Sequence, residues 1–358
     1  MKRIKAALFF FFACVLQTSF AQEKLRIVIA GLSHDHVNSI LTKNKNGDAL
    51  IIGIAEPDQQ LCDRIKTAYQ LPDSIFYKTL SAALKKNHPD LVMAYNAPVE
   101  HLAVIETCMP RKIPVMVEKP LCFSNAEAAR IEMLSKKFNT RVYTNYVSHW
   151  YTSNLELFKR INEKNELGPI HKMVMHGGHR GPVEIGCSKD FLKWLTDPEK
   201  NGGGAITDFG CYGACIMTEL MQGKTPVSVF AITRKLKPAI YPKVDDDATI
   251  VLEYPGATGI VEASWSWPYT IMDVEVYGKN AYLHATDPTT LQSKNEKETK
   301  TEEISEPPYK DELDYLTAVI KNGAPDNNKL LSLERNVIIV RILDAARQSV
   351  KEGRKILL

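Results

Sequence analysis

Short apolar segments alternate with amphipathic segments through the first part of the chain. Stretches such as "PDQQLCDRIKTAYQL" and "SNAEAARIEMLSKKFN" have the apolar spacing of helices. Between such stretches lie runs rich in β-branched and aliphatic residues: "LRIVIAG", "ALIIGIAE", "DLVMAYN", "PVMVEKP" and "RVYTNY". Continuous apolar strands joined by helices indicate a parallel sheet covered on both faces. The pattern therefore predicts an α/β fold that begins with a doubly wound Rossmann domain over residues 22–148.

The pattern changes to longer, alternating segments after residue 148. Turns rich in Pro and Gly, such as "EYPGATGI", join these segments: "HKMVMHGGH", "VSVFAITRKL", "DATIVLEY", "TGIVEASWSW" and "MDVEVYGKNAYLHA". They predict an α+β domain with a mostly antiparallel open sheet over residues 149–310. Residues 311–358 have helical spacing, and we expect these helices to pack back on the Rossmann domain. "WSW" at 265–267 is interpreted as an alternating strand at a subunit contact.

The first residues have the layout of a secretory signal peptide. A basic start is followed by an apolar run and by small residues up to Ala21, which predicts cleavage of residues 1–21. The apolar run is too short for a membrane anchor. Lipoprotein processing at Cys14 is an alternative that the residues before it fit poorly. We expect a periplasmic or otherwise exported protein.

Composition and cysteine usage exclude several classes of function. The net charge of +3 is too small to indicate nucleic acid or a membrane surface as partner. Six cysteines remain after the predicted cleavage, and no Cys-x-x-Cys pair is present. We therefore expect no zinc site or redox motif, and no metal site in general. Buried free thiols are the favoured interpretation, and a disulfide remains open for an exported chain.

The turn after the first strand has the position of a dinucleotide-binding turn. "IVIAGLSHDHVNSIL" places Gly31 at the first glycine of the G-x-G-x-x-G fingerprint, but Ser33 and His36 stand at the second and third. A helix that starts after such a turn can bind a pyrophosphate with its N–H groups. We expect Gly31, Ser33, His34 and His36 to lie at a cofactor, and a simple strand-to-helix turn remains the alternative.

An acidic residue supports the cofactor interpretation. Glu56 ends the second strand and stands where a carboxylate accepts hydrogen bonds from the adenosine ribose. Its charge would repel a 2′-phosphate, so the sequence favours NAD over NADP. Further candidate cofactor residues follow the third and fourth strands: Asn96, Pro98, His101, Glu118 and Lys119. We expect His101 to stabilise its loop rather than to take part in chemistry.

The segment "VMVEKPLCFS" ends a buried strand in a carboxylate, an amine and a proline. Strand ends at the carboxyl edge of a parallel sheet face the cofactor cleft, so we expect Glu118 and Lys119 beside the nicotinamide. A lysine there can donate to a substrate oxygen. Pro120 would hold the backbone, and we predict a cis Lys119–Pro120 bond. The alternative is a surface ion pair between Glu118 and Lys119.

These residues resemble those of the glucose–fructose oxidoreductase, inositol dehydrogenase and rhizopine-catabolism (Gfo/Idh/MocA) family over nearly all of the chain after the leader. The carriers are "EKPL", "NELGPI", "GGGAITDFGCYGAC" and "LDAARQSVKEGRKILL". The resemblance implies hydride transfer between NAD(P) and a sugar, cyclitol or related alcohol. It also implies catalytic roles for Lys119, Asp208 and Tyr212. Many members have histidine where this chain has Tyr212, and the acid often found three positions later is Cys215 here.

The chemistry of these residue types is consistent with that implication. Asp208 and Tyr212 are four positions apart and would share a face of one helix. We expect Lys119 to lower the pKa of Tyr212, so that the tyrosine acts as acid and base. Without the family, a helix N-cap aspartate followed by a core tyrosine would be the first interpretation. Candidate substrate residues are aromatic or basic: Trp150, Tyr151, His179, Arg180 and Trp194.

The leading hypothesis is an exported NAD(P)-dependent oxidoreductase acting on CH–OH groups of a carbohydrate or polyol. Because an exported enzyme cannot use the cytoplasmic pool, we expect tightly bound NAD, with NADP open. One alternative is an NAD-dependent glycosidase that works through a transient keto-sugar. A second is a non-catalytic sugar-binding relative. We further expect a homo-oligomer formed through the C-terminal sheet.

Overall fold

The computed structural model describes residues 23–358. The predicted signal peptide and Cys14 lie outside the described residues. Within residues 23–358, no helix is both long and apolar enough to cross a membrane. The six cysteines of this part of the chain are all free, and five of them are buried. The favoured interpretation of buried free thiols is therefore confirmed for the described residues.

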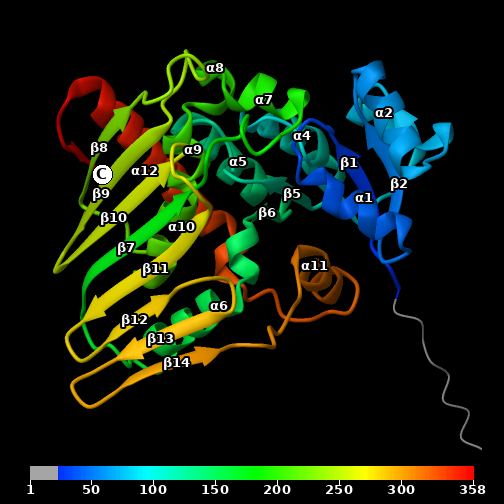
Figure 1. Cartoon of the computed structure of the whole chain (residues 1–358). Coiled ribbons are helices and arrows are strands. Elements are labelled where there is room, and N and C mark those ends of the chain that lie inside the picture. The colour runs from blue at the N-terminus through cyan, green and yellow to red at the C-terminus, as the bar shows by residue number, and fades with distance from the viewer. Residues whose placement is uncertain (1–22) are drawn as a thin grey trace, which may run out of the picture.

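A parallel sheet forms the first domain, at the right of Figure 1. In residues 23–358 it has six strands in the order β3-β2-β1-β4-β5-β6. Its strands are β1 Arg26–Ala30, β2 Leu50–Ala55, β3 Phe76–Tyr77, β4 Leu91–Ala94, β5 Val115–Glu118 and β6 Val142–Asn145. Every neighbouring pair is parallel. The predicted α/β class is confirmed, and β3 is an edge strand that the sequence pattern did not reveal.

Helices connect these strands. They are α1 Val37–Lys45, α2 Gln59–Tyr69, α3 Leu80–Lys86, α4 His101–Cys108 and α5 Asn125–Phe138. Side chains cap three of them at the N-terminus: Asp58, Thr79 and Ser124 accept from backbone N–H groups of α2, α3 and α5. In contrast, α1 follows His36 with no side-chain cap. Helix α4 also lacks a side-chain cap, so both uncapped helices follow turns that carry predicted cofactor residues.

A large mixed sheet forms the second domain, at the left of Figure 1. Among the described residues it has nine strands in the order β14-β13-β12-β11-β7-β10-β9-β8-β15. Only β7 and β10 pair in parallel, so the predicted, mostly antiparallel sheet is confirmed. The strands are β7 Ile170–Gly178, β8 Ser228–Arg234, β9 Asp247–Tyr254, β10 Ala257–Ser264, β11 Ile271–Gly278, β12 Tyr282–Ala285, β13 Thr290–Lys294, β14 Thr299–Glu303 and β15 Ile356–Leu357.

Further helices follow β6 in the chain: α6 Thr152–Phe158, α7 Lys189–Leu195, α8 Pro198–Asn201, α9 Ala205–Asp208, α10 Gly210–Leu220, α11 Glu312–Ile320 and α12 Leu333–Glu352. Of these, α6, α9, α10 and α12 pack against strands of the second sheet. On β9, Ala248 and Ile250 are buried, whereas Thr249 and Val251, which alternate with them, are half-buried on the open face. Helix α12 packs against α5 and β6 as well as against β8 and α10, and so connects the two sheets (Figure 1).

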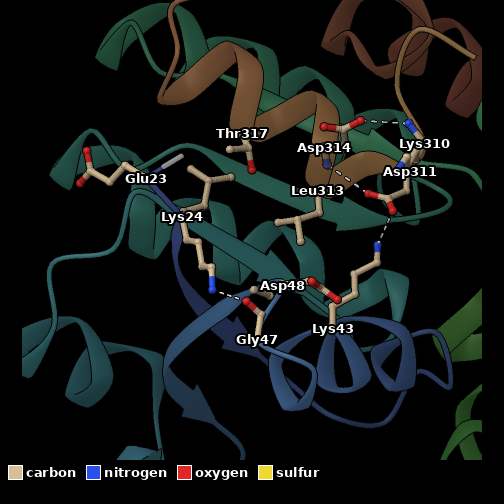
Figure 2. Close-up of a pocket in the computed structure, with 12 residues that line it drawn as sticks. Glu23, Lys24, Lys43, Gly47, Asp48, Lys310, Asp311, Leu313, Asp314 and Thr317 are labelled. Carbon is tan, nitrogen blue, oxygen red and sulfur yellow. Dashed lines mark hydrogen bonds and ion pairs between the residues drawn. The ribbon is translucent and has the colours of Figure 1, made fainter. Parts of the chain in front are cut away.

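A cavity of about 440 Å³ lies at the amino edge of the first sheet (Figure 2). Paired charges line it: Lys43 contacts Asp311 at 2.9 Å, and Lys24 donates to the main-chain oxygen of Gly47. Ligands of doubly wound sheets bind at the opposite, carboxyl edge. This cavity is therefore not the place where the predicted chemistry belongs.

Candidate active site

The carboxyl ends of four neighbouring strands define the site. Because β1, β4, β5 and β6 are parallel neighbours, their last residues meet at one edge of the sheet. These are Ala30, Ala94, Glu118 and Asn145. The turns that follow them carry most of the predicted site residues, and α9 and α10 bring the others from the second domain.

Lys119 forms a buried ion pair across the two domains. Its ammonium contacts the Asp208 carboxylate and donates to the Asp208 main-chain oxygen at 3.1 Å. The other carboxylate oxygen accepts the Trp265 indole N–H at 2.9 Å. Lys119 is 6% and Asp208 is 8% exposed, so both charges are held away from water. The Lys119–Pro120 bond is cis, as predicted.

The two charges keep each other ionised. Burial alone would lower the pKa of Lys119, but Asp208 outweighs it and raises that pKa well above the usual value. Burial alone would raise the pKa of Asp208, but Lys119 and the Trp265 hydrogen bond hold it below the usual value. The site therefore contains an ammonium and a carboxylate rather than their neutral forms.

Tyr212 lies beside this pair at the start of α10. The Lys119 Nζ atom stands over its ring, 5.0 Å from the centroid. No residue of the described chain gives the Tyr212 hydroxyl a hydrogen-bond partner, so that hydroxyl is available to a ligand. The expected lowering of the Tyr212 pKa is wrong. Burial raises it well above the usual value, and the opposing effect of Lys119 is smaller.

Asp208 and Tyr212 do not share one continuous helix. Asp208 ends α9, and α10 begins at Gly210 after a break at Phe209. The Asp208 carboxylate caps neither helix, because its oxygens face Lys119 and Trp265. The N-cap interpretation therefore fails, and the break lets Asp208 and Tyr212 approach the same lysine from different directions.

Glu118 faces away from Lys119, toward His36 and Asn145. Its Oε2 atom lies 3.0 Å from His36 Nδ1, and its Oε1 atom accepts the Asn145 amide at 3.0 Å. Burial would raise the pKa of Glu118, but His36 and Asn145 hold it below the usual value. Conversely, Glu118 raises the pKa of His36 against the effect of burial. A surface ion pair between Glu118 and Lys119 is thus excluded.

The turn from Gly31 to His36 has the shape of a dinucleotide-binding turn. Gly31 has φ +79°, and a Cβ atom there would lie 2.6 Å from Asn96 Cβ, so only glycine fits. Four N–H groups of the turn are already used, donating to Ala55, Glu56, Tyr95 and the His34 ring. Those of Ser33 and Asp35 have no partner among residues 23–358, and a phosphate could accept from both.

A cavity of about 310 Å³ extends from this turn. Glu56 lies in its wall at the end of β2, and its two oxygens accept the N–H groups of Leu32 and Asp58, each at 2.9 Å. Other residues of the wall come from both domains: Ser33, Asp58, Leu61, Ala97, Val99, Glu100, Asp190, Lys193, Trp194 and Lys200. The volume is at the low end for ligand pockets.

Two other cofactor candidates support the turns. His101 is fully buried, and its Nδ1 atom lies 3.1 Å from the Leu121 main-chain oxygen, so it braces the loop after Lys119. Burial lowers the pKa of His101 to about 4. Pro98 is buried at the start of a short 3₁₀ turn, Pro98–Glu100. Both residues agree with a positioning role for this loop.

Trp194 is not at the predicted place. Its indole N–H donates to the Ser33 main-chain oxygen at 3.4 Å, and its ring packs 5.5 Å from the His34 ring. Phe191, one turn earlier on α7, packs 4.7 Å from the same imidazole. Trp194 therefore lies against the cofactor turn and not with Tyr212, because α7 closes over that turn. His34, which these rings cover, is buried.

The remaining substrate candidates differ in their distance from the ion pair. His179 is half-buried, and its ring packs edge-on against Phe209, 5.0 Å away. Arg180 is exposed. Trp150 donates to Asn145 at 3.2 Å, and so reaches the site through one intermediate side chain. No hydrogen bond in the described chain joins Tyr151 to the site.

Trp265 is the site residue that the sequence interpretation missed. β10 ends at Ser264, so "WSW" is not a strand, and the expected subunit contact is wrong for Trp265, whose exposure is 0%. The only signal in the sequence was the position of this tryptophan, directly after the end of a strand. That signal does not identify a partner 57 residues away along the chain.

Two family models match the chain. One, described as "Oxidoreductase family, NAD-binding Rossmann fold", matches residues 25–146, and the other, described as "GFO/IDH/MocA C-terminal domain", matches residues 156–284. Together they span more than half of the 358 residues. The first domain is thus an NAD-binding Rossmann domain.

Curated and solved proteins extend this likeness. Trans-1,2-dihydrobenzene-1,2-diol dehydrogenase of Xenopus laevis is 24% identical over 211 residues, 58% of each chain. The chain thus spans about three fifths of the length of such relatives. An aldose-aldose oxidoreductase from Caulobacter crescentus, complexed with glycerol, has TM-score 0.78 and 20% identity over 94% of this chain and 100% of its own. An inositol dehydrogenase homolog from Azotobacter vinelandii, complexed with NAD⁺, has TM-score 0.78 and 16% identity over 94% and 98%. These structures share the fold.

Proposed function

The chain belongs to the GFO/IDH/MocA oxidoreductase family, and from this premise we propose that it is a dehydrogenase of alcohols. In this proposal it moves a hydride between NAD and a secondary hydroxyl of a sugar, cyclitol or related polyol. The observation that carries the proposal is the buried Lys119–Asp208 pair beside the free Tyr212 hydroxyl, at the carboxyl edge of the sheet.

The turn after β1 would hold the cofactor. Gly31 lets the backbone approach, the N–H groups of Ser33 and Asp35 would bind the pyrophosphate, and Glu56 would face the adenosine ribose. When bound, the nicotinamide supplies the acceptor for the hydride. His36 departs from the third glycine of the fingerprint, and its pairing with Glu118 takes it away from the phosphates.

The charges of the site suggest a division of proton chemistry. Lys119 is protonated, and its ammonium would donate to the substrate oxygen as negative charge develops there. Burial keeps Tyr212 protonated, which makes it a second donor to the substrate. Asp208 and Glu118 are the ionised carboxylates nearby; Glu118 faces His36 and Asn145, whereas Asp208 contacts the Lys119 ammonium that would meet the substrate oxygen. We therefore assign Asp208 as the acceptor of the hydroxyl proton.

Cofactor choice and substrate class follow from the same surroundings. The Glu56 carboxylate, with Asp58 and Glu100 in the same cavity wall, opposes a 2′-phosphate, which favours NAD over NADP. The relatives named for a diol and for inositol, and the one complexed with glycerol, suggest a polyhydroxylated substrate. The His179 ring packs against Phe209, the residue after Asp208, and we propose that His179 and the exposed Arg180 next to it would contact further hydroxyls.

Three further expectations complete the proposal. The predicted signal peptide supports export, which would require NAD to leave the cytoplasm already bound. The half-buried open face of the second sheet supports a homo-oligomer. Fractionation of cells that express the chain with and without residues 1–21 tests export, and light scattering of the purified protein tests the oligomer.

Nucleotide analysis tests the central proposal. The purified protein is denatured, and the released nucleotides are separated by chromatography. We expect NAD, or, after its removal, rebinding of NAD in preference to NADP. With bound NAD, cleavage of a glycoside with no net change in NADH would instead support the redox-cycled glycosidase. If neither nucleotide is released or rebound, the proposal is wrong and a non-catalytic relative remains.

A further inference from the structure

Two histidines and a carboxylate meet where the turn after β1 reaches the end of β5. His34, His36 and Glu118 each offer one ligand atom, and these atoms all lie within 4.8 Å of one another. Two imidazoles with one carboxylate form a donor set suited to Zn²⁺ and related first-row metals. We propose that His34, His36 and Glu118 form a binding site for a divalent transition-metal ion, next to the Lys119–Asp208 pair. This inference goes beyond the proposed hydride transfer and does not depend on it.

The spacing of the donor atoms fits a metal centre. Metal bonds of about 2.0–2.2 Å place neighbouring ligand atoms roughly 3.0–3.5 Å apart. His36 Nδ1 and Glu118 Oε2 are 3.0 Å apart, which is already the separation of two ligands of one ion. The rings of His34 and His36 have centroids 4.4 Å apart. A small approach of the His34 ring would complete the triad.

His34 carries a polar atom that lacks a partner. Its Nε2 atom is buried and has no hydrogen-bond partner in residues 23–358, although the residue is only 1% exposed. A buried polar group without a partner is destabilising. A metal ion would give this nitrogen a partner. The ring proton would then move to Nδ1, and the 3.2 Å contact from the His36 N–H would be given up.

Neighbouring side chains already hold the candidate ligands in place. The Asn145 amide donates to Glu118 Oε1 at 3.0 Å and leaves Oε2 directed at His36, and Trp150 fixes Asn145 in turn at 3.2 Å. Such outer hydrogen bonds orient metal ligands in known centres. Phe191 packs on the His34 ring. The site thus has a supporting shell as well as three donors.

The local charge also favours a dication. The His34 ring is buried, and a neutral imidazole nitrogen can bind a metal. Lys119 and Asp208 neutralise each other, which leaves the Glu118 carboxylate as the charge that a dication would meet. The His36 side chain is 40% exposed. It therefore provides an entry path and open coordination positions for a substrate oxygen or water.

A second group on the sheet surface serves as a control. His176, Asp273 and Glu275 also lie within ligand distance of one another. However, both Asp273 oxygens already face imidazoles, of His176 at 2.7 Å and His284 at 3.0 Å, and Glu275 accepts the Tyr282 hydroxyl at 3.1 Å. No atom of these residues is buried without a partner in the described chain. We therefore expect this group to stay metal-free.

Titration of the metal-free protein with Co²⁺ tests the site. We expect one Co²⁺ per chain, visible d–d absorption without a thiolate charge-transfer band, and displacement by Zn²⁺. Loss of an outer hydrogen bond typically weakens metal affinity 10–100-fold, so we expect about that loss in Asn145→Ala. His36→Gln and Glu118→Gln should lose more, and the control His176→Gln should bind as wild type does.

Several outcomes would overturn the site. A thiolate band would assign the metal to the free cysteines instead. Unchanged affinity in both His36→Gln and Glu118→Gln, or no binding by the wild type, would exclude the triad. Melting curves of each metal-free variant show that it is folded. NAD binding, titrated separately on metal-free protein, keeps failure of this site distinct from failure of the proposed function.

Discussion

Replacing Lys119 with methionine should destabilise the protein, because it leaves the buried Asp208 carboxylate without its cation. The substitution keeps the length of the side chain and removes the ammonium. Asp208, which is 8% exposed, would keep only the Trp265 N–H as a partner for its carboxylate. Removal of one partner of a buried pair leaves an uncompensated charge and costs about 3–5 kcal/mol. We expect the free energy of unfolding of Lys119→Met to fall by that amount.

A second substitution separates folding from catalysis. In Lys119→Met/Asp208→Asn no charge is left, and the asparagine oxygen can still accept from Trp265. Replacement of a whole buried pair by neutral groups is often close to neutral, so the double variant should regain most of the lost stability. Its turnover should nevertheless stay at least about 10²-fold below wild type, because the donor and the proton acceptor are both gone.

Urea unfolding and NAD titration of the three proteins provide the comparison. We expect NAD affinity to change little, since the Gly31 turn and Glu56 are intact. If Lys119→Met unfolds at the same urea concentration as wild type, the Lys119–Asp208 pair is not buried and stabilising as described. If the double variant transfers hydride at a near-normal rate, the pair has no catalytic role, whatever the stability of either protein.

Other substitutions probe single groups of the same structure. Tyr212→Phe removes a hydroxyl without a partner in the described chain, so the free energy of unfolding should change by less than ~1 kcal/mol. Turnover should fall about 10²-fold or more, and normal turnover would show that Tyr212 is not part of the active site. Glu56→Gln removes a charge from the cavity wall and should raise NADP affinity relative to NAD, and an unchanged ratio would show that Glu56 does not select the cofactor. The hydrogen bond to Asp273 raises the pKa of His176, so the stability from this pair is complete below about 6.5 and is lost as pH rises through the folded pKa. The free energies of unfolding of wild type and His176→Gln, measured across that pH range, should therefore converge at high pH. A constant difference between the two proteins would argue against a stabilising His176–Asp273 pair.

The first sheet was predictable because its burial is visible in the sequence. β1, β4 and β5 are almost entirely buried, which requires the continuous apolar runs that identified them. β14, Thr299–Glu303, is polar and exposed at a sheet edge. The two residues of β3 are too few to form a pattern. Edge strands depend on pairing with a neighbour, and a sequence pattern does not show that pairing.

The site was predictable in its residues and less so in its electrostatics. Lys119 and Asp208 stand in motifs with a known place in the fold, and the structure brings them into contact. The predicted lowering of the Tyr212 pKa was wrong because this pKa depends mainly on burial, and the spacing of residues in the sequence does not reveal burial. Trp194 and Trp265 were misplaced because long-range packing determines their partners, the Ser33 oxygen and the Asp208 carboxylate.

Single-turnover reduction of the bound cofactor tests the central claim most directly. The protein, loaded with one NAD per chain, is mixed rapidly with an excess of one polyol or sugar at a time, and NADH absorbance is recorded. We predict that at least one of these compounds produces up to one NADH per chain, and that Lys119→Met/Asp208→Asn, equally loaded, produces none on the same timescale. NADH formation at the same rate in both proteins, or none in the loaded wild type with any sugar, cyclitol or polyol, would contradict the account.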